Sequence, residues 1–147
     1  MKISIIVISA LVIGFLIRLI MFGQESQKMV VKLGVTTENK LNACLSPLNC
    51  VSSFESTDPE LQKLKIEMNP ISKIKESAEK KGLQLIESNE TYLYLNHKSS
   101  LFGFVDDVEF LYLPESQELH FRSASRVGKS DLGANKKRIL EFLSELN

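Results

Sequence analysis

The apolar N-terminal segment is the feature that most constrains this chain. Residues 3–23 read ISIIVISALVIGFLIRLIMFG, and only Arg18 interrupts the apolar run. A helix of about 20 apolar residues crosses a bilayer, and Arg18 lies near the distal end, where its long side chain can reach the interface. We therefore predict a membrane anchor at residues 1–23, a tether at 24–40, and one globular domain at 41–147.

A cleaved signal peptide is the alternative to an uncleaved anchor. Cleavage requires a short apolar core and a small-x-small site, and residues 18–27, RLIMFGQESQ, offer no good site. We expect the uncleaved anchor and keep secretion after cleavage as the alternative. Lys2 favours an N-terminus on the inside, whereas Arg18, Lys28 and Lys32 favour the reverse under the positive-inside rule. The flanking charges thus leave the orientation open.

Two cysteines, Cys44 and Cys50, lie in the sequence CLSPLNC. Their spacing suits a small disulfide loop around a proline turn, and disulfides persist outside the cytosol; free thiols are the alternative. Zinc would need further Cys or His ligands, and both histidines lie far along the chain, so we predict no metal site. The cysteine pair favours a single-pass inner-membrane protein whose domain faces the periplasm.

The balance of charge gives no sign of a nucleic-acid partner. The chain has 18 basic and 18 acidic residues, whereas a nucleic-acid-binding domain carries a basic face. The stretch SASRVGKS is close to a phosphate-binding loop, but Ser123 occupies its first glycine position and the surrounding pattern is antiparallel. We therefore predict no cofactor.

The pattern along the globular part predicts an α+β fold. Asn69 and Pro70 mark a helix start, and Gly82 marks its end. Asp58 and Pro59 mark another start. Residues 83–88 and 91–97 predict one hairpin, 103–113 and 118–127 a second, and a final helix begins near Ser130. We expect a four-stranded antiparallel sheet of two hairpins, with helices on one face and the other face partly solvated.

The second hairpin carries a charged ladder. Strand alternation puts Asp107, Glu109, Arg122 and Arg126 on one face, with Glu109 opposite Arg122. The ordinary interpretation is cross-strand ion pairing on a solvated face, which stabilises little. The functional interpretation is a polar site for a ligand or partner. The turn that follows, with Ser130 and Asp131, leads into a helix whose N–H groups could bind an anion, or these residues cap the helix.

Three stretches resemble the domain of unknown function 1499, a family of bacteria and photosynthetic eukaryotes. They are Cys44–Ser53, Leu101–Leu113 and His120–Ile139, within a resemblance that spans about Leu41 to Leu146. The cysteine loop departs from the family pattern at Leu48, and the basic residue expected before the LFGF stretch is replaced near Lys98–Ser100. The resemblance implies no activity. It implies a signature that maps here onto Asp106, Asp107, Glu109, Arg122, Ser123, Ser125, Arg126, Ser130, Asp131, Asn135 and Arg138.

Three functional hypotheses follow. The first is a non-enzymatic envelope module, binding or structural, that uses the ladder and the 128–135 loop, with an unknown protein or small molecule as partner. The second is a hydrolase for an anionic substrate, in which Asp or Glu acts as acid or base and Arg holds the substrate. The third is a carrier of a small apolar molecule. The candidate binding residues are Asp107, Glu109, Arg122, Arg126, Ser130, Asp131, Asn135 and Arg138; the sequence assigns no catalytic residue.

Overall fold

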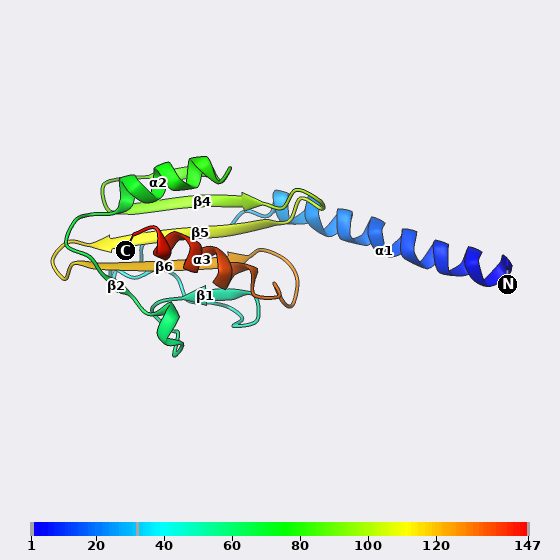
Figure 1. Cartoon of the computed structure of the whole chain (residues 1–147), viewed down its shortest axis with the longest axis horizontal. Coiled ribbons are helices and arrows are strands. Elements are labelled where there is room, and N and C mark those ends of the chain that lie inside the picture. The colour runs from blue at the N-terminus through cyan, green and yellow to red at the C-terminus, as the bar shows by residue number, and fades with distance from the viewer. Residues whose placement is uncertain (1, 32, 147) are drawn as a thin grey trace.

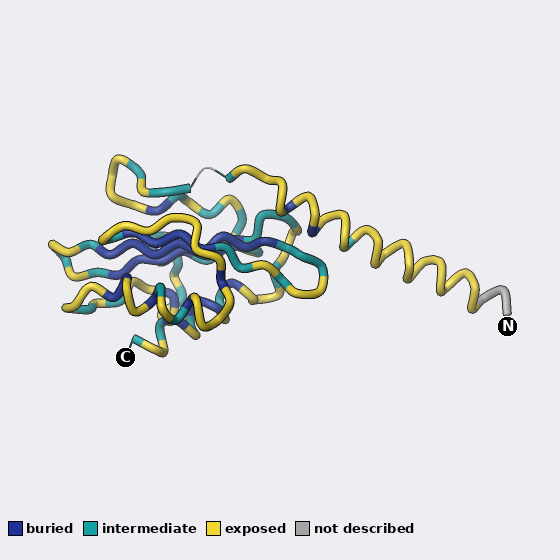
Figure 2. The backbone as a smooth tube through the Cα atoms, turned by 90° about the horizontal axis from the view of Figure 1, so that it is seen from above, coloured by how far each residue is buried: buried dark blue, intermediate teal, exposed yellow. Residues whose placement is uncertain are grey.

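The structure, a computed structural model, describes residues 2–31 and 33–146. Helix α1 (Lys2–Lys28) projects from the globular part (Figure 1). Its apolar residues from Ile5 to Phe22 are largely exposed (Figure 2), and an 18-residue window of this apolar run has a mean hydropathy of 2.8, high enough for a membrane span. A helix that is apolar all round is normally buried or membrane-spanning. α1 is therefore an N-terminal apolar helix with the length and composition of a membrane anchor or a signal segment.

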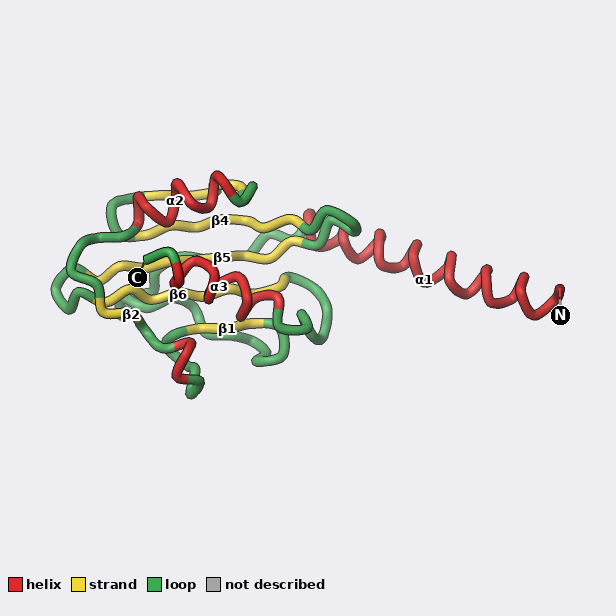
Figure 3. The backbone as a smooth tube through the Cα atoms, viewed as in Figure 1, coloured by secondary structure: helices red, strands yellow, loops and turns green. Residues whose placement is uncertain are grey.

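The globular part is built on one antiparallel sheet (Figure 3). Both predicted hairpins are confirmed. β3 (Gln84–Ser88) pairs with β4 (Tyr92–Lys98), and β5 (Val105–Leu113) pairs with β6 (Glu118–Ser125). β4 and β5 also pair, so these four strands lie in sequence order across the sheet.

Two short strands extend the sheet, so the predicted number of four strands was wrong. β1 (Cys50–Ser52) and β2 (Leu64–Lys65) both pair with β6 on the side away from β5. Within the described residues the sheet therefore has six strands. Strands of three and two residues are too short to show the alternation by which a strand is recognised in sequence.

Helices α2 (Ile71–Lys80) and α3 (Ala134–Ser144) cover one face of the sheet, as predicted (Figure 1). The rings of Phe110 and Phe142 meet edge to face, with centroids 5.2 Å apart. The main apolar core comes from both helices and the strands beneath them: Leu61, Ile71, Ile74, Ala78, Leu83, Leu93, Leu95, Val108, Phe110, Tyr112, Leu119, Phe121, Ile139 and Phe142.

The two predicted helix starts in the middle of the chain are confirmed to within a residue. The Asn69 carboxamide accepts a hydrogen bond of 3.0 Å from the N–H of Ile71, and Gly82 follows α2 with a φ of +74°. That conformation suits glycine, which has no Cβ. Asp58 accepts from the N–H of Glu60 at 3.0 Å and begins the short 3-10 helix η1 (Pro59–Leu61).

The other face of the sheet is covered by irregular chain over β4, β5 and β6, so the charged ladder expected on a solvated face is buried, while β3 at the edge stays exposed. The chain on either side of β1 crosses this face and buries a second apolar cluster. Its buried members are Leu41, Tyr92, Tyr94 and Leu111, against which Leu33, Phe54 and Leu113 pack. The charged ladder lies on the same face. It is therefore an internal feature of the domain.

The C-terminal end of α1 docks against the turn between β4 and β5. Ser26 is buried; its hydroxyl accepts from the N–H of Val105 at 3.1 Å and donates to the Gly23 carbonyl at 2.7 Å. The Gln27 carboxamide donates to the Gly103 carbonyl at 3.0 Å. A Cβ at Gly23 would lie 1.7 Å from the Phe102 carbonyl oxygen, so only glycine permits this approach.

Candidate functional site

Polar side chains on both faces of β5 and β6 form the candidate site. Alternation sends Asp106 toward α3 and Asp107 toward the opposite face. Each carboxylate meets an arginine at 2.7 Å, Arg138 for Asp106 and Arg126 for Asp107. We call the two resulting clusters the Arg138 network (His97, Asp106, Ser123, Asn135, Arg138) and the Arg126 network (Tyr94, Asn96, Asp107, Arg126).

The Arg126 network satisfies a buried carboxylate almost completely. Arg126 donates from Nε to both oxygens of Asp107 at 3.0 and 3.1 Å, and from Nη2 to Oδ1 at 2.7 Å. The Tyr94 hydroxyl donates to the same oxygen at 2.6 Å, and the Asn96 carboxamide at 2.8 Å. The Asp107 carboxylate raises the pKa of Arg126, while burial and the bond to Asp107 raise the pKa of Tyr94. Such a network fixes the positions of its members.

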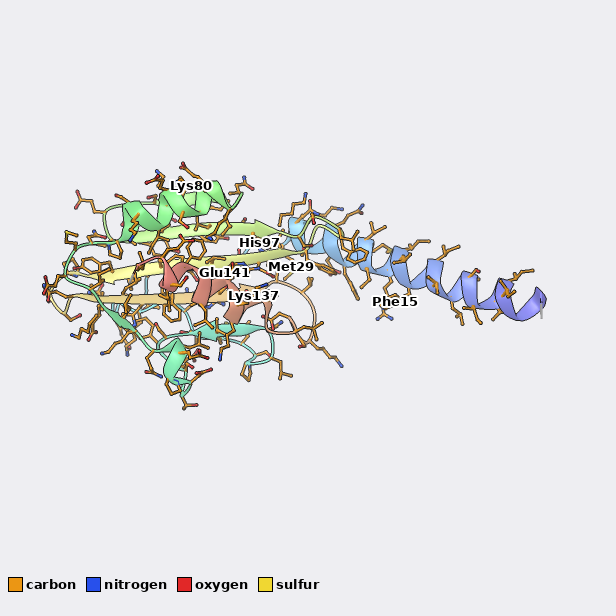
Figure 4. All side chains as sticks on the ribbon, viewed as in Figure 1. Phe15, Met29, Lys80, His97, Lys137 and Glu141 are labelled. Atoms are coloured by element: carbon orange, nitrogen blue, oxygen red, sulfur yellow. A yellow bond between two sulfur atoms is a disulfide. The ribbon has the colours of Figure 1, made fainter. Side chains whose placement is uncertain are left out.

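Arg126 also binds the end of α1. Its Nη1 donates to the carbonyl of Ser26 at 3.2 Å and to that of Met29 at 3.1 Å. These carbonyls belong to the last turn of α1 and the residue after it, where backbone acceptors lack helical partners. Figure 4 labels Met29 at this junction. One guanidinium therefore joins the ladder of the sheet to the N-terminal helix.

Glu109 and Arg122 form a second buried pair on the ladder face. They are cross-strand neighbours, as predicted, and Arg122 Nη1 donates to Glu109 Oε2 at 3.1 Å. The other carboxylate oxygen accepts from the Tyr92 hydroxyl at 2.7 Å and from the N–H of Gly34 at 3.1 Å. Burial raises the pKa of Glu109, and the bonds from Tyr92 and Arg122 oppose this rise.

The guanidinium of Arg122 is less fully paired than that of Arg126. Its side chain is 8% exposed, and its buried Nε has no hydrogen-bond partner among the residues that the structure describes. A buried donor without a partner costs free energy. Removal of Glu109 would therefore leave a buried charge without compensation.

The Arg138 network joins α3 to the sheet. Arg138 Nη2 donates to Asp106 at 2.7 Å and to His97 Nδ1 at 3.0 Å, and Nη1 donates to the Asn135 carbonyl oxygen at 2.7 Å and to the Ser123 hydroxyl at 3.1 Å. Burial and the charge of Arg138 lower the pKa of His97. Because a guanidinium can only donate, His97 Nδ1 accepts the bond from Arg138, and the ring proton of His97 lies on Nε2.

The candidate anion site at residues 128–131 is occupied by the chain itself. α3 begins at Ala134, later than predicted, and the Asp131 carboxylate accepts from the N–H groups of Gly133 at 3.0 Å and Asn135 at 2.8 Å. The Ser130 hydroxyl accepts from the N–H of Leu132 at 3.2 Å. These residues cap the start of α3, which is the ordinary interpretation of this turn.

A hollow of about 250 Å³ lies beside the Arg138 network. It is lined by Lys81, Leu83, His97, Ala134, Lys137, Arg138 and Glu141. Figure 4 labels three of these residues, His97 on β4 and Lys137 and Glu141 on α3. Each of its three cations is paired with a carboxylate: Lys81 with Glu145, Lys137 with Glu141 and Arg138 with Asp106. His97 and Lys81 are not among the candidate residues predicted from the sequence. Strand and helix patterns do not show that β4, the end of α2 and α3 meet at one place.

Cys44 and Cys50 form a disulfide, with their Cα atoms 5.7 Å apart. The bond ties the loop before β1 to the ladder face, where Cys50 pairs in register with Ala124. Among the residues that the structure describes, no group of three His, Cys, Asp or Glu side chains could hold a metal ion.

The signature residues recognised in the sequence thus gather in the two networks, the Glu109–Arg122 pair and one helix cap. The model of the family described as "Protein of unknown function (DUF1499)" matches residues 40–146. The chain belongs to the DUF1499 family. No curated protein and no solved structure gave a match. In this DUF1499 domain, the signature residues Ser123, Asn135 and Arg138 connect α3 to the sheet, and Arg126 connects the sheet to α1.

Proposed function

We propose that this DUF1499 protein is a membrane-anchored envelope module with a binding or structural role and no catalytic one. We infer that α1 stays attached, crosses the inner membrane once, and holds the domain on the periplasmic side. The Cys44–Cys50 disulfide supports an oxidising compartment. The docking of Gly23 and Ser26 against the β4–β5 turn supports an uncleaved helix, because α1 packs as part of the domain.

The observation that carries the proposal is the link from Arg126 to the end of α1. A flexible tether would let the domain rotate freely above the membrane. Here the guanidinium that neutralises Asp107 also binds two carbonyls at the end of α1. We therefore propose that the ladder fixes the orientation of the domain relative to its anchor.

The binding part of the proposal concerns the more accessible polar groups. Asp107 and Glu109 have their acceptors taken by neighbouring donors, so we assign them and their arginines to holding the fold. The hollow beside His97 remains as a surface for a small ligand or a protein partner. The hydrolase and carrier hypotheses lack comparable support, because the ladder carboxylates are bound by arginines and apolar side chains fill the core.

Complementation of a gene deletion tests the proposal. Three forms are compared: the full chain, residues 23–147 behind an unrelated membrane helix, and residues 23–147 behind a cleavable signal. We expect the first two to restore the phenotype and the soluble form to fail. Full rescue by the soluble form would refute a membrane-mounted function. Protease added to spheroplasts should digest the domain, and complete protection would refute the periplasmic location.

A further inference from the structure

Three loops lie at the end of the sheet from which α1 departs. Strand direction places them there: residues 99–104 follow β4, residues 126–133 follow β6, and residues 44–49 precede β1. Figure 1 shows these loops at the same end of the sheet as the C-terminal end of α1. The Asn49 carboxamide donates to the Gly128 carbonyl at 2.7 Å, and the Asp131 N–H to the Leu48 carbonyl at 3.2 Å, so two of the loops form one surface.

Each of these loops exposes leucine to an unusual degree. The exposed fractions are 100% for Leu45, 64% for Leu48, 77% for Leu101 and 96% for Leu132. Isolated exposed apolar residues are common on protein surfaces, but these four share one end of the domain. They are not covered by any part of the chain that the structure describes.

The backbone of Leu132 adds an independent observation. Its φ is +53°, in the left-handed region that side chains with a Cβ adopt at a cost. Asparagine or glycine would fit this position with less strain. The backbone is therefore strained at a leucine whose side chain is almost fully exposed.

The leucine-bearing loops lie next to the C-terminal end of α1 (Figure 1). The apolar run of α1 ends at Gly23, and Gly23 touches the backbone of Phe102 in the first loop. If residues 3–22 cross the hydrocarbon core, the first loop lies at the level of the membrane surface. The charges agree with this: the three loops contain one acidic residue, Asp131, whose carboxylate caps α3, whereas Glu67, Glu90 and Glu115 lie in loops at the opposite end.

We propose that the three leucine-bearing loops rest on the lipid bilayer and form a second membrane contact beside α1. This inference rests on the proposed membrane anchor. Leu45, Leu48, Leu101 and Leu132 enter the interface between headgroups and acyl chains, while Lys98 and Lys129, both exposed, meet anionic headgroups. In this arrangement the end of the sheet that carries these loops faces the membrane surface.

Single tryptophans test this contact, because the chain contains none. The full-length variants Leu132→Trp and Leu45→Trp report on the loops, Phe15→Trp reports on α1, and Met68→Trp, 82% exposed at the opposite end, is the matched control. Each is reconstituted into vesicles of phosphatidylcholine and phosphatidylglycerol, with and without brominated acyl chains. We expect blue-shifted emission and strong loss of intensity on bromination for both loop variants and for Phe15→Trp, with no change for Met68→Trp.

The outcomes separate the two proposals. If Phe15→Trp is quenched while both loop variants behave like Met68→Trp, the loop contact is overturned and the anchor stands. If Phe15→Trp is not quenched, the anchor is overturned and the contact with it. Blue-shifted loop emission without quenching by brominated lipid means that protein covers the leucines, which also overturns the lipid contact.

Discussion

Replacement of Gly23 by alanine is expected to weaken the docking of the end of α1 on the domain without unfolding either part. The added methyl group would lie 1.7 Å from the Phe102 carbonyl oxygen and 2.8 Å from its carbon. Both atoms are backbone, so they cannot move aside as a flexible side chain would. Relief requires a shift of more than about 1 Å, which in a packed region costs about 1–3 kcal/mol.

Undocking also removes that overlap. It breaks the bonds from Val105 N–H to Ser26 and from Gln27 to the Gly103 carbonyl, each worth about 0.5–1.5 kcal/mol, and the two bonds from Arg126 to the Ser26 and Met29 carbonyls. Alanine also favours the helix by about 1 kcal/mol over glycine. We therefore expect α1 to stay helical while the docked state loses about 2 kcal/mol, which is roughly thirtyfold in its equilibrium.

Hydrogen exchange on the full chain in lipid nanodiscs measures this loss. Amides of residues 24–30 and the amide of Val105 should exchange up to roughly thirtyfold faster in Gly23→Ala, while the strand amides of β5 and β6 keep their protection. Gly14→Ala is the matched control, because a Cβ at Gly14 meets nothing within 4 Å. Equal exchange in the two variants at residues 24–30 would show that α1 is not docked and would refute the reasoning.

Four further measurements probe the interior and the caps. Arg122→Ala leaves Glu109 without its ion-pair partner and should cost about 3–5 kcal/mol in denaturant unfolding; a loss below about 1 kcal/mol would show that the pair is solvated. Cys44→Ser opens a loop with a sequence separation of six and should cost about 2 kcal/mol, whereas the same melting temperature with and without reductant would contradict a formed disulfide. Asp131→Ala removes the cap of α3 and should cost about 0.5–2 kcal/mol, and unchanged exchange at the first turn of α3 would argue against the cap. Burial lowers the pKa of His120 from 6.5, so its contribution to stability is full above pH 6.5 and is lost as the pH falls through the folded-state pKa; His120→Gln should flatten that loss, and an unchanged slope of stability against pH would oppose the assignment.

Local patterns predicted much of the hairpin geometry. Alternation and the turn at residues 114–117 were enough to pair Glu109 with Arg122 and to place Asp107 on the same face. Neighbouring strands joined by a short turn have only one register that buries their apolar face. The helix starts at Asp58 and Asn69 were equally local, because capping residues lie next to the turns that they cap.

Long-range packing decided the features that the sequence left open. The ladder looked like a solvated face because alternation shows which residues share a side, and it cannot show what covers that side. The chain on either side of β1, with no periodic pattern, supplies that cover, and Glu109 and Arg122 are buried beneath it. The short strands β1 and β2 exist only because β6 offers them an edge.

By itself, the sequence determined the apolar N-terminal helix, the two hairpins and membership of the DUF1499 family, because each depends on neighbours along the chain or on a contiguous motif. Only the tertiary structure decided that Arg126 reaches the end of α1 across a sequence separation of 100 residues. It also decided that loops distant in sequence present their leucines at one end of the sheet. Such contacts depend on how strands and helices stack in space, and no local pattern encodes that arrangement.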